Sequence, residues 1–175
     1  RIDGWDACSG YYYADSTING FSHTHLSGTG CCDYGDVLLM PTVGEQKYLP
    51  TGSQSQKMAY ASSFSHQNET AEPGYYSVFL DTYQVKAELT ATKRAAIHRY
   101  TFPESREAGF ILDFDYSLQR QTNKEMEIEV ISPTEICGRK KTMYWAFDQY
   151  INFYAKFSKP FTYTLVTDSM ALDEG

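Results

Sequence analysis

The chain is 175 residues long, which fits one domain with a sizeable core. Its 22 acidic residues outnumber its 15 basic ones, and the formal charge of -7, without a basic stripe, argues against a nucleic-acid partner. No apolar run approaches the roughly 18 residues that a membrane-spanning helix needs, and the 15% aromatic content excludes a disordered chain or a coiled coil.

The residues before Gly74 have the composition of long surface loops. They are rich in Gly, Ser, Thr and Tyr and hold only brief apolar stretches, such as 37–40. Polar, aromatic loops laid over a sheet often carry function, so we expect a loop-rich region over 1–73. Because the chain opens at Arg1 without an initiator methionine and closes at 171–175 without a terminating element, we also expect a piece of a longer protein.

The densest chemistry lies in the segment 20–36. His23 and His25 would share one face if this segment were extended. With Asp33 or Asp36 the two histidines could bind zinc, but two histidines without an assignable third ligand are more often hydrogen-bonded loop formers. Metal binding and loop formation therefore both stay open on the residues alone.

Glycine is frequent in the same segment. A positive φ and a close approach of the backbone are available at three positions: Gly28, Gly30 and Gly35. These residues could shape the loop against a ligand or make tight turns. The lysine and the following helix of a phosphate-binding loop are missing, so the segment is not a phosphate site.

Two further clusters have a functional and a structural interpretation. Trp5 with the tyrosines of 11–13 could form the floor of a sugar site or cover the core. The polar cluster 63–76 is best interpreted as a well-bonded connection before a strand. No Gly-x-Ser-x-Gly elbow is present, so a self-contained nucleophilic enzyme has little support.

From Gly74 onward, alternation of apolar and polar residues predicts half-buried strands separated by turn formers. The expected strands are 76–80, 85–92, 96–102, 109–116, 126–132, 142–157 and 161–167. A single helical turn is expected at most over 69–72. Asp113 and Asp115 would share one strand face. Two aspartates placed in this way are more typical of a solvated face than of an acid and base pair. Short strands at this spacing predict an all-β, antiparallel β-sandwich, with regular strands over 74–175.

Several longer strings carry a resemblance that runs over nearly the whole chain. They are Gly-Trp-Asp at 4–6, Gly-Phe-Ser-His-Thr-His-Leu-Ser-Gly-Thr-Gly at 20–30, Asp-Tyr-Gly-Asp at 33–36, Ser-His-Gln-Asn-Glu-Thr-Ala-Glu-Pro-Gly-Tyr-Tyr at 65–76, Glu-Leu-Thr-Ala-Thr at 88–92, His-Arg-Tyr-Thr-Phe-Pro at 98–103 and Lys-Phe-Ser-Lys-Pro-Phe at 156–161. Together they resemble the calcium-dependent exo-α-mannosidases of glycoside hydrolase family 92.

This resemblance implies an amino-terminal β-sandwich domain, of which residues 1–175 are one fragment. It implies a downstream (α/α)6 barrel, absent from these residues, with the active-site pocket where the two domains meet. The family's acid and base carboxylates and most of its calcium ligands belong to the barrel. No catalytic residue and no metal ligand is therefore assigned in this chain, which we expect to be inactive alone.

The resemblance implies a substrate-binding role for one loop, as part of the pocket wall near the terminal sugar. Its candidate residues are His23, His25, Gly28, Thr29, Gly30 and Asp33, with Trp5 as a weaker candidate. The implied reaction is the removal of terminal α-linked mannose with inversion, assisted by calcium.

The implied partners are a mannose-containing glycan and the chain's own downstream helical domain, with no nucleic acid and no membrane span. The implied location is periplasmic, or secreted and at the cell surface. Two alternatives stay open: a non-catalytic carbohydrate-binding module, whose tyrosines and tryptophans would stack on sugars, and a purely structural domain that supports the barrel.

Overall fold

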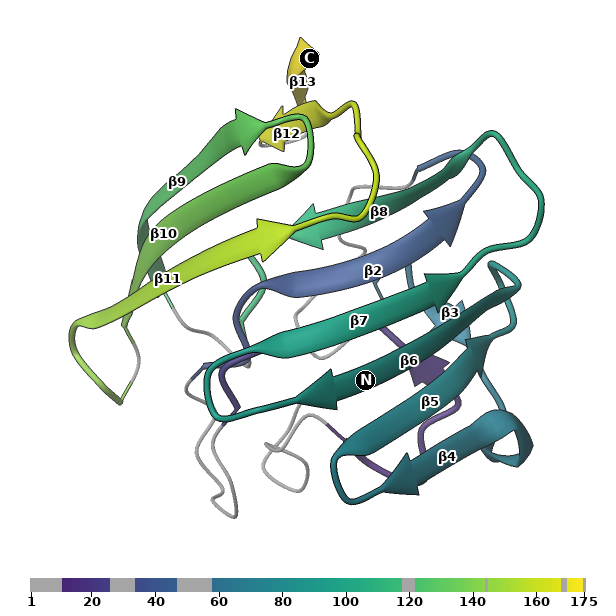
Figure 1. Cartoon of the computed structure of the whole chain (residues 1–175). Coiled ribbons are helices and arrows are strands. Elements are labelled where there is room, and N and C mark those ends of the chain that lie inside the picture. The colour runs from purple at the N-terminus through teal and green to yellow at the C-terminus, as the bar shows by residue number, and fades with distance from the viewer. Residues whose placement is uncertain are drawn as a thin grey trace. The chain divides into compact units, whose positions relative to one another are not determined.

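The fold of the chain is built from antiparallel strands (Figure 1). The computed structural model describes residues 11–25, 34–46, 58–117, 122–143, 145–167 and 170–174. Within these residues there is no α-helix, and the one helical element is the 3-10 turn His66–Asn68. Each strand pairing with a defined register is antiparallel. The all-β, antiparallel class predicted from alternation is confirmed.

The chain divides into two compact units. The first includes 11–21 and 38–112, and the second includes 22–37 and 113–175. Among the described residues, no helix has the length and hydrophobicity needed to span a bilayer.

The first unit contains a four-stranded meander, whose strands follow one another in chain order (Figure 1). They are β4 (Glu69–Glu72), β5 (Tyr75–Leu80), β6 (Val85–Ala91) and β7 (Ala96–Thr101). Side chains on one face are completely or almost completely buried: Val78, Leu80, Val85 and Ala87. Three predicted strands, 76–80, 85–92 and 96–102, are confirmed here.

Two smaller pairings complete the first unit. β1 (Thr17–Ile18) pairs with β3 (Ser62–Ser63), and β2 (Leu38–Val43) pairs with β8 (Ala108–Asp113). Phe21 extends the second pairing through an isolated bridge to Leu39. The brief apolar stretch before Gly74 therefore contributes to a sheet.

The single helical turn expected over 69–72 is wrong. Those residues form β4, which pairs with β5 from Glu69 opposite Val78 to Glu72 opposite Tyr75. Gly74 closes this hairpin with a φ of 80°, a value that favours glycine. The helical turn lies just before the strand, where Ser65 caps it by accepting a hydrogen bond from the Gln67 amide.

The second unit is organised around a three-stranded sheet. Its strands are β9 (Thr122–Ser132), β10 (Glu135–Met143) and β11 (Gln149–Lys156), with β10 in the centre. A separate hairpin joins β12 (Thr164–Thr167) to β13 (Met170–Glu174). The chain end, expected to lack a terminating element, thus carries a strand.

One prediction in this unit is only half right. The continuous strand expected over 142–157 is two strands, because β10 ends at Met143 and β11 begins at Gln149. Most of β10 precedes the expected start. Its run Cys-Gly-Arg-Lys-Lys at 137–141 lacks an apolar alternation, so the periodicity gave no signal for a central strand.

Gly138 occupies a position on β10 where a larger residue does not fit. A Cβ there would lie 2.6 Å from Cε1 of Phe153 and 2.8 Å from the carbonyl oxygen of Glu127. Gly138→Ala should therefore destabilise the sheet by about 1–3 kcal/mol. Hydrogen exchange of β10 peptides in the full-length protein measures this. Gly109→Ala is the matched control, because its Cβ would meet only Nε2 of Gln46, at 3.6 Å. Equal effects of the two substitutions would contradict the steric argument.

The Glu88–Arg99 pair gives the first unit a dependence on acid. Glu88 accepts two hydrogen bonds from Arg99, at 2.8 and 2.7 Å, and one from Tyr75, at 2.8 Å. These donors, with Arg99 foremost, lower the pKa of Glu88 from 4.5 to about 2. A depressed pKa stabilises the fold above the unfolded-state value, and this contribution is lost as the pH falls through the folded-state value.

We therefore expect stability to fall between about pH 4.5 and pH 2. Glu88→Gln should lower stability near neutral pH and make its loss in acid less steep. Thermal unfolding of both full-length proteins across this range tests the expectation. Identical slopes for the two proteins would contradict it.

Candidate functional site

The candidate site is the loop that the sequence singles out for binding. Of its predicted residues, the structure describes two, His23 and His25. The others lie outside the described residues: Trp5, Gly28, Thr29, Gly30 and Asp33. The site is therefore described through the two segments 22–25 and 34–37, which both belong to the second unit.

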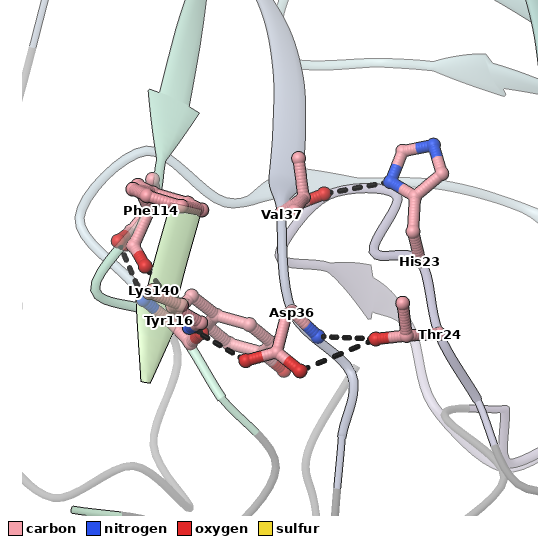
Figure 2. Close-up of polar contacts among 8 residues, drawn as sticks. His23, Thr24, Asp36, Val37, Phe114, Tyr116 and Lys140 are labelled. Atoms are coloured by element: carbon pink, nitrogen blue, oxygen red, sulfur yellow. Dashed lines mark hydrogen bonds and ion pairs between the residues drawn. The ribbon is translucent and has the colours of Figure 1, made fainter. Parts of the chain in front are cut away.

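The two segments are joined by backbone hydrogen bonds. The His23 amide donates to the carbonyl oxygen of Asp36 at 2.8 Å, and the Gly35 amide donates to that of Thr24 at 3.5 Å. The His23 ring is half-buried, and its Nδ1 lies 2.7 Å from the carbonyl oxygen of Val37 (Figure 2). Because a carbonyl only accepts, Nδ1 carries a proton and donates to it.

His25 lies on the exposed part of the loop. Its Nε2 is 2.8 Å from Oγ of Ser22. Thr24, between the two histidines, has a φ of 60°, which is outside the extended region. The shared face that an extended segment would give the two imidazoles is therefore not formed. Their proposed binding role rests on the loop as a whole.

A buried ion pair is formed by Asp36 of the 34–37 segment (Figure 2). Nζ of Lys140 is 2.6 Å from Oδ1 of Asp36, and both side chains are 0% exposed. Nζ also donates to the carbonyl oxygens of Phe114 at 3.0 Å and Tyr116 at 2.8 Å. Oδ2 of Asp36 accepts from the Thr24 hydroxyl at 3.2 Å. The Asp36 carboxylate, considered above for zinc, is thus held by a lysine and a threonine.

Sequence reasoning missed Lys140, although a signal for it exists. On β10, Ile136, Lys140 and Thr142 are buried, whereas Arg139 between them is exposed. Strand alternation thus places this lysine on the inward face, where a charge needs a partner. That signal becomes visible only once β10 is recognised as a strand.

The backbone of the loop is strained at several residues. Among the described residues of the loop, three other than glycine have a positive φ: Thr24 at 60°, Tyr34 at 75° and Val37 at 57°. Gly35, at 77°, has the positive φ predicted for it. Such conformations cost of order 1–3 kcal/mol each in residues other than glycine and persist where the surroundings impose them, often at binding sites.

The paired acids do not form a site. β8 ends at Asp113, whose Oδ1 accepts a hydrogen bond from the Tyr116 amide at 2.9 Å. Asp115 lies beyond the strand and is exposed. The shared strand face predicted for them is therefore absent, and the expectation of a solvated pair holds only for Asp115.

The cluster over 63–76 is the well-bonded connection that the sequence indicated. Nδ1 of His66 pairs with Glu69, whose other oxygen accepts a hydrogen bond from Tyr76 at 2.6 Å. The His66 ring also stacks on Tyr13, with 4.2 Å between ring centroids. The hydrogen bond to Glu69 is the main cause of a raised His66 pKa. These contacts join β4 and β5 to the start of the described chain.

Metal binding by the described residues has no support from their geometry. Within the described ranges, no three His, Cys, Asp or Glu side chains gather as a metal would require. A shallow depression on the β9–β10–β11 sheet is lined by Glu127, Glu129, Cys137, Arg139 and Asn152, among others, and includes neither histidine of the loop.

The fold and the loop together define the class of the domain. It is an antiparallel all-β domain with a strained polar loop that contains one partner of a buried ion pair. A sequence model described as the glycosyl hydrolase family 92 N-terminal domain matches residues 1–175. The chain belongs to this family, as the motifs of the sequence indicated.

Solved structures and one curated protein agree with this assignment. The chain is 38% identical to the family GH92 alpha-mannosidase BT3965 from Bacteroides thetaiotaomicron, with a TM-score of 0.89 over 98% of the chain. It is 26% identical to the GH92 family glycosyl hydrolase ccman5, with a TM-score of 0.73 over 95% of the chain. An uncharacterized secreted glycosidase from Arthroderma benhamiae is 30% identical over 105 residues, or 59% of the chain.

These relatives are much longer than the chain. It spans 23% of each solved structure and 13% of the curated relative. The match at a TM-score of 0.89 confirms the predicted fold class, a β-sandwich domain of a larger enzyme.

Proposed function

We propose that this chain is part of a glycoside hydrolase that removes terminal α-linked mannose from glycans by inverting hydrolysis. The observation that carries the proposal is the likeness over 98% of the chain, at 38% identity, to a family GH92 alpha-mannosidase, one structure of which contains mannoimidazole. Because the chain spans only 23% of that relative, the activity belongs to the whole protein. The domain alone is inactive.

In this proposal the loop over 20–36, called the histidine loop after His23 and His25, forms one wall of the sugar pocket. His23 is oriented by its Nδ1, which donates to the carbonyl oxygen of Val37. His25 is exposed and has a hydroxyl partner in Ser22. Gly28, Thr29, Gly30, Asp33 and Trp5 complete the proposed wall. Such a wall binds and orients the terminal sugar, and positioning is a large part of what an enzyme contributes.

The chemical step requires groups outside this chain. Inverting hydrolysis needs an acid on the leaving oxygen and a base that activates water, roughly 6.5–9.5 Å apart. We assign both to a downstream helical domain, together with most ligands of calcium. When bound, calcium accepts sugar hydroxyls as oxygen ligands and helps to flatten the ring. The described residues do not fit a calcium centre of their own, so they bind and orient only.

The proposal includes a location outside the cytoplasm, periplasmic or secreted. It is supported by the curated relative, which is described as a secreted glycosidase. The partners are a mannose-containing glycan and the downstream domain of the same protein.

Release of mannose from α-linked mannobioses by the full-length protein tests the proposal. We expect release that a calcium chelator abolishes and added calcium restores, with no release by the 175-residue chain assayed beside it. Release that the chelator leaves intact would contradict the calcium requirement. No release from any linkage, together with sugar binding by the chain alone, would favour a carbohydrate-binding module.

A further inference from the structure

We propose that Lys140 is a positioning residue, which sets the geometry of the histidine loop through Asp36. The inference rests on the proposed function, because it gives Lys140 the role of fixing the geometry with which the histidine loop binds the sugar. It concerns a side chain on β10, which sequence motifs do not connect with the loop.

The first step is how Lys140 itself is held. Its ammonium group has three hydrogens, and three oxygens lie within 3.0 Å of Nζ: Oδ1 of Asp36 and the carbonyl oxygens of Phe114 and Tyr116. The amine also lies 5.5 Å from the centroid of the Phe114 ring. With complete burial and contacts from two chain segments, the position of the charge is fixed.

The second step leads from Asp36 to the loop. Asp36 contacts the 22–25 segment at three points, and Figure 2 shows those to Thr24. Its Oδ2 accepts from the Thr24 hydroxyl at 3.2 Å, its amide donates to the same hydroxyl oxygen at 3.2 Å, and its carbonyl accepts from the His23 amide at 2.8 Å. The Asp36 backbone makes two of these contacts and its carboxylate makes one, so the residue tied to the buried side chain is Thr24, which lies between the two histidines.

The third step concerns the orientation of the His23 ring. Nδ1 of His23 is engaged by the carbonyl of Val37, the residue next to Asp36. Val37 is β-branched and has a φ of 57°, a conformation that its side chain disfavours. The carbonyl points at His23 only while this strained turn is held. Asp36 precedes this turn and is paired with Lys140, so the buried ion pair anchors the residue next to Val37.

A purely stabilising role would not need this pair. Buried ion pairs are often replaced by well-packed apolar residues without loss of stability, because the charges lose much of their hydration on burial. The particular contribution of charge here is orientation, since the Lys140 ammonium group holds one carboxylate oxygen of Asp36 and thereby directs the other toward Thr24. The same strand carries an exposed pair for comparison: Arg139 with Glu127, at 2.7 Å, with side chains 72% and 63% exposed.

The test uses the double variant Asp36→Leu with Lys140→Met in the full-length protein. It removes both charges together, so no unpaired charge is left buried. We expect a modestly lower melting temperature, because the carbonyl oxygens of Phe114 and Tyr116 lose their donor, and a fall in kcat/KM for α-linked mannobiose of at least about tenfold, mainly through KM. Glu127→Leu with Arg139→Met is the matched control and should leave the melting temperature and kcat/KM unchanged. Native kcat/KM in the folded Asp36–Lys140 variant would overturn the proposal.

A second readout does not depend on activity. In the full-length protein with ¹⁵N-labelled histidine, the His23 signals, assigned with His23→Gln, report which ring nitrogen carries the proton. We expect Nδ1 protonation in the unchanged protein and a mixture of tautomers in the double variant. If the unchanged protein releases no mannose, the proposed function fails, but these signals still decide the positioning role. Unchanged ring signals in the double variant would overturn it.

Thr24→Val covers the case in which the double variant does not fold. Thr24 is exposed, and valine keeps its shape while removing the hydroxyl that joins it to Asp36. The ion pair stays intact. We expect the same direction of change, with a raised KM and a shifted His23 signal at a native melting temperature. No change in either quantity would contradict the step from Asp36 to the loop.

Discussion

Replacing Lys140 alone with methionine should lower the free energy of unfolding by about 3–5 kcal/mol. Methionine has a similar volume and leaves no cavity, so the cost is electrostatic. The Asp36 carboxylate, 0% exposed, would be left buried without its counter-charge. The carbonyl oxygens of Phe114 and Tyr116 would also lose their donor. Each buried acceptor left without a donor costs about 1–3 kcal/mol of desolvation, and the expected loss in unfolding free energy includes this cost.

The measurement is hydrogen exchange under native conditions in the full-length protein, read at peptides of β10 and β11. It reports the opening free energy of this sheet without the need for the whole protein to unfold in one step. Arg139→Met, one residue away, is the control. Because the Arg139–Glu127 pair is exposed, its loss should cost less than about 1 kcal/mol. Comparable losses for the two variants would show that burial of the pair does not determine its contribution.

The two charges should also be strongly coupled. Asp36→Leu alone leaves a buried ammonium group without a carboxylate, so we expect it to be as damaging as Lys140→Met. The double variant should be much more stable than the sum of the two single effects implies, because contacting residues do not contribute additively. This comparison separates the electrostatic cost from a general sensitivity of the loop to mutation.

Much of the fold could be predicted because its strands have a simple pattern. Over 76–91 apolar and polar residues alternate, with Val78, Leu80, Val85 and Ala87 buried, and short turns join neighbouring strands. β10 could not be predicted in this way. Its inward positions include Gly138 and Lys140, which are tolerated because Phe153 covers the glycine and Asp36 pairs with the lysine. Both compensations come from other segments of the chain, and a local pattern does not contain them.

The binding role of the loop stays a prediction, and the contacts that build the loop could be predicted only in small part. The motif over 20–36 identified the loop, and the positive φ at Gly35 followed from the residue type. The positive φ of Thr24 and Val37 could not be predicted from residue type, because both residues are β-branched and disfavour a positive φ. Tertiary contacts impose these conformations. The zinc hypothesis for Asp36 depended on a free carboxylate, and residues far along the chain determine that it pairs with Lys140 instead.

His25→Ala in the full-length protein should reduce kcat/KM for α-linked mannobiose by about 10–100-fold. The reason is the loss of one hydrogen bond to the sugar, worth about 1–3 kcal/mol when a polar partner is left unsatisfied. The melting temperature should not change, because the His25 side chain is exposed and the buried ion pair of the loop does not include it. The measurement is steady-state hydrolysis combined with thermal unfolding of the same preparations.

Two further substitutions determine whether the ring itself acts on the sugar. Ser22→Ala removes only the hydroxyl 2.8 Å from Nε2, so it should cause a smaller loss than His25→Ala by leaving the ring less well oriented. His25→Gln retains a polar group of similar reach and should restore part of the activity. An unchanged rate in His25→Ala would exclude a pocket-wall role for this residue and favour a structural domain. A lower rate with a lower melting temperature would instead mean that His25 acts on the loop rather than on the sugar.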